Sequence, residues 1–218
     1  MASTHLVDVA PERLTGWVDR FTDSHGPLTW SVVTDDEGQA WQAQAQDGSW
    51  ARLRSWRAPR PDDAAGPAPG WERPPPLLVL LVRRGGYAVA VVGEDGALVR
   101  HKVGTRHVQS RTAAGGWSQQ RFARRRGHQA DVLVEAVAGH AARLLGEKPA
   151  GRATVPEGVV LGGDRSLADA VLQGLPAATA AVRGLPRRTL WDLPDPRRSV
   201  LDDAVRRGRA VLVQVHNA

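Results

Sequence analysis

The stretch LLVLLVRRGGYAVAVVGEDGALVRHKVG, residues 77–104, decides the fold of the larger part of this chain. It contains three runs rich in valine and leucine, at 77–83, 86–93 and 96–104, and glycine-containing turns separate them. This pattern predicts three consecutive strands joined by tight turns. The first two runs are almost continuously apolar, so we expect both of their faces to be buried, as in a sheet covered by helices.

Helical and strand patterns alternate after residue 104. The helical patterns cover 118–145, 166–175 and 201–208, and the strand patterns cover 158–164, 189–193 and 210–215. Strands that alternate with helices favour a sheet with helices on its faces. We therefore predict a fold of the broad α/β class, specifically an α+β arrangement with a mixed sheet. The strand at 210–215 is expected to close this sheet.

A proline-rich segment divides the chain. Residues 58–76 contain seven of the fifteen prolines, which excludes a helix or a central strand and predicts a semi-stiff linker. Residues 1–57 combine a helical stripe with short strands and predict a small α+β module. Six of the eight tryptophans precede residue 72, and we interpret them as core residues of this module, with base-stacking platforms as the alternative. Residues 77–218 form the predicted larger domain.

The composition excludes several kinds of chemistry. The absence of cysteine excludes disulfides, thiolate metal sites and thiol nucleophiles. The strand at 77–83 has no acidic residue, which argues against a two-metal nuclease, and no histidine pair has the helical ligand spacing around a glutamate. No G-x-S-x-G pattern surrounds Ser110 or Ser118, which argues against a serine hydrolase. We expect neither a metal nor a cofactor.

The N-terminal sequence MASTHLVDVAPERL lacks the basic and apolar regions of a signal peptide, and the longest apolar run, LLVLLV, is too short to span a bilayer. We therefore expect a cytoplasmic protein without membrane contact, and a monomer.

The sequence VVLGGDRSLADAV, residues 159–171, has the strand-turn-helix order of a phosphate cradle. Capping of the helix by Asp164 or Ser166 is the interpretation that we favour, because both residue types are strong N-caps.

Positive charge is concentrated in one segment. Residues 96–130 contain eight Lys or Arg and no Asp or Glu, which leaves a net charge of −2 on the rest of a chain whose total is +6. A basic segment on a nearly neutral body is typical of a protein that binds a polyanion. An ordinary solvated face rich in arginine is the alternative.

Within the basic segment, GGWSQQRF at 115–122 has an unusual mixture of small, aromatic and amide residues. Gly115 and Gly116 favour a mobile loop that becomes helical near Ser118. Arginines bind phosphates, and a glutamine offers both a donor and an acceptor. These residues predict a loop and helix start that present an amide group inside a site lined by phosphates.

The sequence GGWSQQRFARRR, residues 115–126, resembles the catalytic loop and following helix in the middle domain of the class I release factors of eukaryotes and archaea, whose pattern is G-G-Q-S-x-x-R-F-x-R-x-R. Trp117 stands where those factors carry the glutamine. The positions that match are Gly115, Gly116, Ser118, Arg121, Phe122, Arg124 and Arg126.

The chain more closely resembles the Vms-type release-factor-like family, and within it the bacterial, actinobacterial-like branch of peptidyl-tRNA hydrolases. In that family the glutamine follows glycine as G-x-x-Q, which matches Gly116 and Gln119. Gln120 is adjacent, so both glutamines remain candidates.

The resemblance implies a ribonuclease H-like release-factor catalytic domain over 77–218, after the small N-terminal helix-plus-strands module. It implies hydrolysis of the ester between a nascent peptide and tRNA in rescue or quality control of stalled ribosomes. Gln119 or Gln120 would position water, with Gly115 and Gly116 in the catalytic loop. The implied partners are the large ribosomal subunit, its rRNA and peptidyl-tRNA. The residues expected to bind RNA are Lys102, Arg106, Arg111, Arg121, Arg124, Arg125 and Arg126.

The sequence is also compatible with two alternatives. The same loop could cleave tRNA near its 3′ end by using a ribose 2′-hydroxyl as the nucleophile. A module without catalytic activity could instead use the arginines only to bind the ribosome or another RNA.

Overall fold

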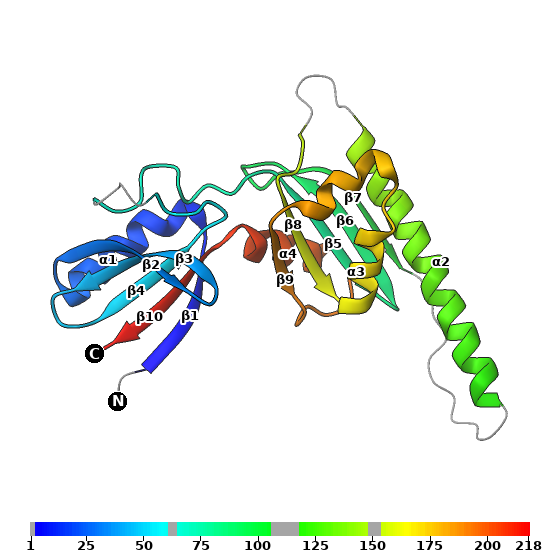
Figure 1. The fold of residues 1–218 in the computed structure, drawn as a ribbon, viewed down its shortest axis with the longest axis horizontal. Helices are drawn as coiled ribbons and strands as arrows, with labels where there is room; N and C mark the ends of the chain where they lie inside the picture. Colours follow the sequence, from blue (N-terminus) through cyan, green and yellow to red (C-terminus); the bar gives the residue numbers. More distant parts are fainter. Residues whose placement is uncertain (1–2, 61–64, 106–117, 148–153) are drawn as a thin grey trace. The chain divides into compact units, whose positions relative to one another are not determined.

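The computed structural model describes residues 3–60, 65–105, 118–147 and 154–218, and of residues 3 and 118–127 it describes the backbone. The chain divides into two compact units (Figure 1). The first comprises Met1–Pro74 with Arg209–Ala218, and the second comprises Pro75–Gly208.

The first unit is a sheet of five strands in the order β1-β10-β4-β3-β2, with every neighbouring pair antiparallel. One face packs against a helix, and the shared core contains Phe21, Trp41, Leu53 and Val213. The strands are β1 (Ser3–Val9), β2 (Leu28–Asp35), β3 (Gly38–Ala45), β4 (Trp50–Arg54) and β10 (Val211–Asn217), and the helical segments are η1 (Pro11–Arg13) and α1 (Leu14–His25).

The last strand differs from its predicted position. We expected it to close the larger sheet, but β10 lies between β1 and β4, where Val213 pairs with Val7 and Leu53. Val211, Val213 and Val215 alternate along β10 and lie buried in the first core. Periodicity of this kind specifies a strand and its apolar face, and it carries no information about which distant strands become its neighbours.

The proline-rich segment is also more than a linker. Trp71 is only 8% exposed and belongs to the core of the first unit. Its carbonyl oxygen accepts a hydrogen bond of 2.8 Å from the hydroxyl of Ser55. Trp41 is fully buried, and Trp17 and Trp30 pack against the same core, which confirms the core interpretation for these four tryptophans.

The second unit is built on a mixed sheet in the order β7-β6-β5-β8-β9. Strands β5, β6 and β7 form the predicted antiparallel meander, and β8 and β9 continue the sheet parallel to β5. The mixed sheet expected for a ribonuclease H-like domain is therefore confirmed. The elements are β5 (Leu77–Arg83), β6 (Gly86–Val92), β7 (Leu98–Thr105), α2 (Ser118–Gly146), β8 (Gly158–Gly163), α3 (Arg165–Gln173), η2 (Ala177–Gly184), β9 (Arg187–Leu190) and α4 (Arg198–Arg209).

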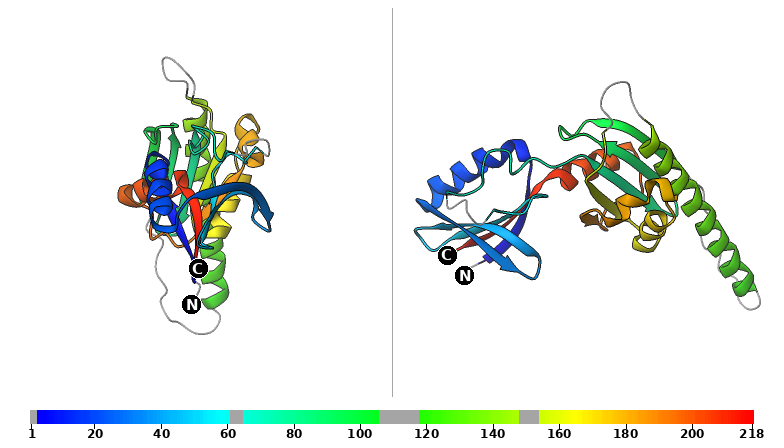
Figure 2. Two further views of the ribbon diagram at one scale, coloured as in Figure 1. Left: turned by 90° about the vertical axis from the view of Figure 1, so that its left-hand side faces the viewer. Right: turned by 45° about the horizontal axis from the view of Figure 1, so that its top comes forward.

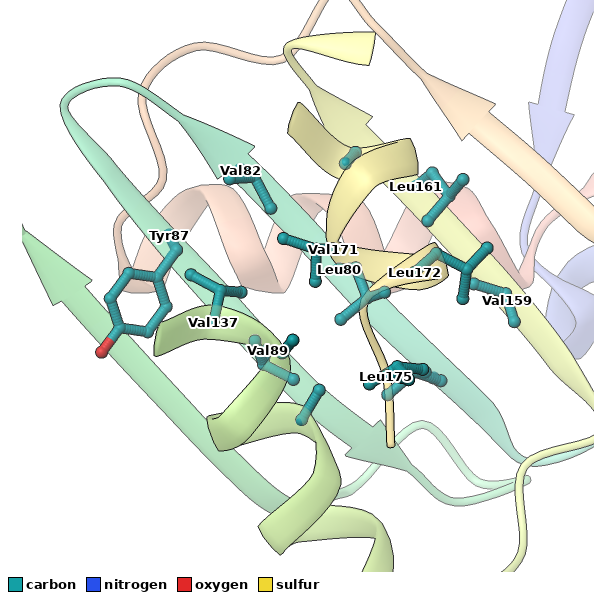
Figure 3. Close-up of a cluster of buried hydrophobic side chains, with 14 of the residues drawn as sticks. Leu80, Val82, Tyr87, Val89, Val137, Val159, Leu161, Val171, Leu172 and Leu175 are labelled. Atoms are coloured by element: carbon teal, nitrogen blue, oxygen red, sulfur yellow. The ribbon is translucent and has the colours of Figure 1, made fainter. Parts of the chain in front are cut away.

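Helices cover both faces of this sheet, as the apolar sequence of β5 and β6 requires. Every residue of β6, and every residue of β5 except Arg83, is buried. Helices α2 and α3 lie on one face and α4 lies on the other (Figures 1 and 3). The α2 side holds the main apolar cluster, in which Leu80 and Val89 of the sheet meet Val137 of α2 and Val171 of α3. Burial of each such side chain stabilises the fold by roughly 1.5–3 kcal/mol.

Two glycines of the second unit should respond oppositely to alanine. The backbone of Gly163 has a φ of +91°, and a Cβ there would overlap the carbonyl oxygen of Val82. We expect Gly163→Ala to lower the free energy of unfolding by about 1–3 kcal/mol. Gly139, inside α2, has no atom within 4 Å of its Cβ position. We expect Gly139→Ala to raise the free energy of unfolding by about 0.5–1 kcal/mol. Urea denaturation followed by circular dichroism measures both changes, and equal effects of the two variants would contradict the assignment.

Candidate functional site

Helix α2 is much longer than the sheet that it covers. Its 29 residues correspond to about 43 Å at 1.5 Å per residue. The buried residues of its described side chains run from Leu133 to Leu144, whereas His128, Gln129 and Asp131 are exposed. Residues 118–129 extend about 18 Å along the axis before the first buried residues. Figure 2 shows this N-terminal part of α2 beyond the edge of the sheet.

The structure locates part of the predicted site in this projecting segment. The helix begins at Ser118, which confirms the predicted start of the helix, and the loop expected before it lies outside the described residues. Gln119 and Gln120 lie in its first turn, and the backbone of Arg121 and of Arg124, Arg125 and Arg126 follows within the next two turns. The side chains of these residues lie outside the described part of the chain. Gly115, Gly116, Arg106 and Arg111 lie entirely outside the described residues.

Lys102 is the one predicted RNA-binding residue whose side chain is described. It is exposed on β7, the edge strand of the second sheet, opposite Val89 of β6. Its side chain is on the face of the sheet that carries α2, because Val89 belongs to the cluster under that helix.

Arg100, two residues earlier on β7, has a structural role. Its guanidinium donates hydrogen bonds to the backbone carbonyls of Glu147 and Thr154, the second at 3.2 Å. Glu147 directly follows α2, so the guanidinium lies where the helix dipole favours a positive charge. Arg100 therefore contributes to the segment's positive charge and also fastens the C-terminal end of α2.

The described carboxylates do not form a metal site. Within the described residues, no group of three or more His, Asp or Glu side chains is arranged to hold a metal ion. Asp192 is paired with Arg207 at 2.8 Å, and Asp95 accepts a hydrogen bond from the amide of Ala97 within its turn. These two carboxylates thus have local structural partners.

Asp164 caps α3, as the favoured interpretation of VVLGGDRSLADAV predicted. Its carboxylate accepts hydrogen bonds from the backbone N–H of Leu167 at 3.2 Å and from the hydroxyl of Ser166 at 2.7 Å. The hydrogen bond from Ser166 is the main cause that lowers the pKa of Asp164 below its ordinary value of 3.8. The charged carboxylate is therefore the form that the folded state prefers.

Removal of this cap should destabilise the second unit. We expect Asp164→Ala to lower the free energy of unfolding by about 1 kcal/mol at neutral pH, the usual cost of a lost N-cap. Because the folded pKa is depressed, the charge-dependent part of this stability is present above pH 3.8 and disappears as the pH falls through the folded pKa. Asp164→Asn, which keeps an acceptor and cannot titrate, is the control. Denaturation curves at several pH values measure the difference, and an identical pH dependence in wild type and Asp164→Asn would contradict it.

A comparison with known families decides the relationships of this chain. The sequence model described as the Actinobacteria/chloroflexi VLRF1 release factor matches residues 75–214, well over half of the chain. The chain belongs to this family. The resemblance to Vms-type release-factor-like proteins is thereby confirmed. Membership in a release factor family implies a role in translation and an interaction with the ribosome. The search of curated proteins found no significant match.

The family match covers the mixed sheet, all of its helices and the first part of β10. Residues 1–74 lie outside it, so the match is restricted to the second unit and the first part of β10. Among the helices that the structure describes, none is long and apolar enough to cross a membrane.

Two basic residues beside Lys102 were not selected from the sequence. His140 and Arg143 lie one turn apart on α2, and Lys102 is close enough to influence the pKa of His140. The spacing of His140 and Arg143 on one predicted helix was the only signal available in the sequence. Their proximity to Lys102 depends on how α2 crosses β7.

Proposed function

We propose that this protein is a peptidyl-tRNA hydrolase that releases nascent peptides from stalled complexes of the large ribosomal subunit. The observation that carries the proposal is the position of Gln119 and Gln120 in the first turn of a helix that projects beyond its domain. Membership in a release factor family supports it. A projecting helix allows a small segment to enter a narrow, RNA-lined centre while the domain stays outside.

The proposed chemistry suits a glutamine. An amide side chain is a poor base, but it can orient a water molecule toward the ester carbonyl or donate a hydrogen bond to the developing oxyanion. Correct placement of the water supplies much of the rate enhancement, because the reaction then avoids the entropic cost of assembling its components. The ribose of the tRNA and the ribosomal RNA would supply the remaining groups.

Gln119 is our preferred catalytic residue. It follows Gly116 with the G-x-x-Q spacing of the family that the sequence resembles. Successive positions on an α-helix diverge by about 100° around the axis, so two adjacent glutamines do not face the same target. Gln120 is therefore the alternative to Gln119 and not its partner, and Gly115 and Gly116 would let the preceding backbone approach the tRNA closely.

The basic residues would hold the segment in place. Arg106, Arg111, Arg121 and the run Arg124–Arg126 surround the glutamines in sequence, and Lys102 extends the charge onto the sheet. Contacts between such side chains and RNA phosphates release bound cations, so the affinity would fall steeply as salt increases.

Replacement of the working glutamine should abolish release without abolishing binding. We expect Gln119→Ala to reduce the rate of peptide release about 10²- to 10³-fold, the usual cost of one lost contact to the reacting centre. Gln129→Ala, which alters an exposed glutamine of the same helix, is the matched control and should release at the wild-type rate. The measurement is single-turnover release of a labelled peptide from peptidyl-tRNA bound to large subunits, together with co-sedimentation.

The result of this assay also separates the competing functions. Normal release by Gln119→Ala with inactive Gln120→Ala would transfer the role to Gln120, and release by the double variant would refute the glutamine mechanism. Peptide that carries attached nucleotides would identify cleavage of the tRNA 3′ end in place of ester hydrolysis. Subunit binding without release by the wild type would identify a binding module.

A further inference from the structure

The region where β7 meets α2 contains a second concentration of positive charge, away from the glutamines. Lys102 on β7 and Arg143 on α2 are both exposed, and the positive charge of each acts on the half-buried His140 of α2. We propose that Lys102, His140 and Arg143 form a second binding site for the phosphate backbone of RNA. The inference rests on the proposed function, in which the ribosome supplies that RNA.

A stacked pair of rings fixes the position of His140. The imidazole of His140 lies over the ring of Tyr87, with the ring centroids 5.2 Å apart and the planes at 18°. Tyr87 is 8% exposed at the margin of the main core, with its hydroxyl directed away from the labelled apolar side chains (Figure 3). Gly104, its partner on β7, leaves room for the ring, because a Cβ there would lie 2.6 Å from the hydroxyl oxygen.

The pair fastens α2 to the edge of the sheet at this point. It therefore holds the basic groups of α2 and of β7 on one preorganised surface. A site built on a helix and a strand keeps its geometry better than one built on loops.

The hydrogen bonding of His140 leaves one donor for a ligand. Arg143 donates to Nδ1 of His140, because a guanidinium has donors only. Burial is the largest cause that lowers the pKa of His140, and the charges of Arg143 and Lys102 lower it further. The neutral ring that accepts at Nδ1 carries its proton on Nε2. The surface thus offers an ammonium group, a guanidinium group and an imidazole N–H.

The charges of Lys102 and Arg143 are not neutralised within the described part of the chain. None of the ion pairs found there includes either residue, and Glu147, one turn after Arg143, forms no ion pair with it. Glu135 is five residues before His140, which turns it about 140° away around the helix axis. Two cations that act on the same histidine and have no ion-pair partner repel each other, and an anion that binds between them offsets this repulsion.

Arg100, also on β7, differs from Lys102 in that its side chain is held by hydrogen bonds. It lies on the same strand and face, but two backbone carbonyls occupy its guanidinium. Among the described cations of β7 and of the C-terminal half of α2, Lys102 and Arg143 are therefore the ones held by neither a carboxylate nor backbone carbonyls. Arg143 lies about 36 Å along α2 from Gln119 at 1.5 Å per residue. RNA is the polyanion that a release factor meets at such distances from its catalytic segment, since the ribosome surrounds it with phosphates.

The test is the salt dependence of binding to isolated large ribosomal subunits and to a short RNA duplex. We expect the double variant Lys102→Gln/Arg143→Gln to weaken binding to both about 10- to 20-fold at 0.15 M salt. The slope of log affinity against log salt should fall by about 1.4–1.8, because two phosphate contacts are lost. In NMR spectra, the imidazole signal of His140 should shift when the duplex is added to the wild type.

Two variants serve as matched controls. Arg197→Gln/Arg206→Gln removes the same net charge from two exposed residues, one directly before α4 and one in it, of which Arg206 is paired with Asp203. It should leave affinity and slope near the wild-type values. Lys102→Arg/Arg143→Lys keeps both charges and should retain binding. Thermal unfolding followed by circular dichroism verifies that every variant is folded.

The outcomes distinguish this site from the proposed function. A slope unchanged by Lys102→Gln/Arg143→Gln, or equally reduced by the α4-side control, refutes the phosphate site and leaves peptide release untouched. Weaker binding to subunits with unchanged duplex binding identifies an acidic protein surface as the partner and overturns the assignment to RNA. Peptide release unaffected by the double variant Gln119→Ala/Gln120→Ala refutes the catalytic proposal alone. Wild type that binds neither probe refutes both.

Discussion

Burial of β5 and β6 on both faces is the constraint on which the second unit depends. These strands consist almost entirely of valine, leucine and alanine, and all of their apolar residues are buried. Such strands need helices on each side, because exposure of either face would lose the stabilisation from apolar burial along the whole strand. Helices α2 and α3 meet this need on one face and α4 on the other. The position of α2 is thus a consequence of the packing of the sheet.

The division of α2 into a packed part and a projecting part connects this packing to function. The packed part supplies Leu133, Val137 and Ala141 to the core, and Arg100 fastens its end. Because the helix is continuous, the anchored residues also set the direction of the projecting turns that carry Gln119 and Gln120. Anchoring one end of a helix about 43 Å long also fixes the position of its other end, which a loop with the same number of residues would not do. The same anchoring brings Lys102 and Arg143 within electrostatic reach of His140.

The first unit is closed by a segment from the far end of the sequence. Insertion of β10 between β1 and β4 completes a sheet whose other strands come from the first quarter of the chain. The second unit is therefore inserted into the first in sequence, and both of its ends connect to the same sheet. Removal of residues 209–218 from an expressed fragment would take a central strand away from the first unit.

The sequence by itself determined the elements whose signals are local. The apolar runs of β5 and β6, the onset of α2 at Ser118 and the cap at Asp164 follow from residue type and spacing, and the GGWSQQRFARRR segment was sufficient to indicate the family. Only the tertiary structure decided which distant segments meet: β10 with β1 and β4, Trp71 with the first core, and Lys102 with His140 and Arg143. The physical reason is that periodicity reports which face of an element is buried. Which element packs against that face depends on how the whole chain folds, because many apolar or basic surfaces have the same local sequence pattern.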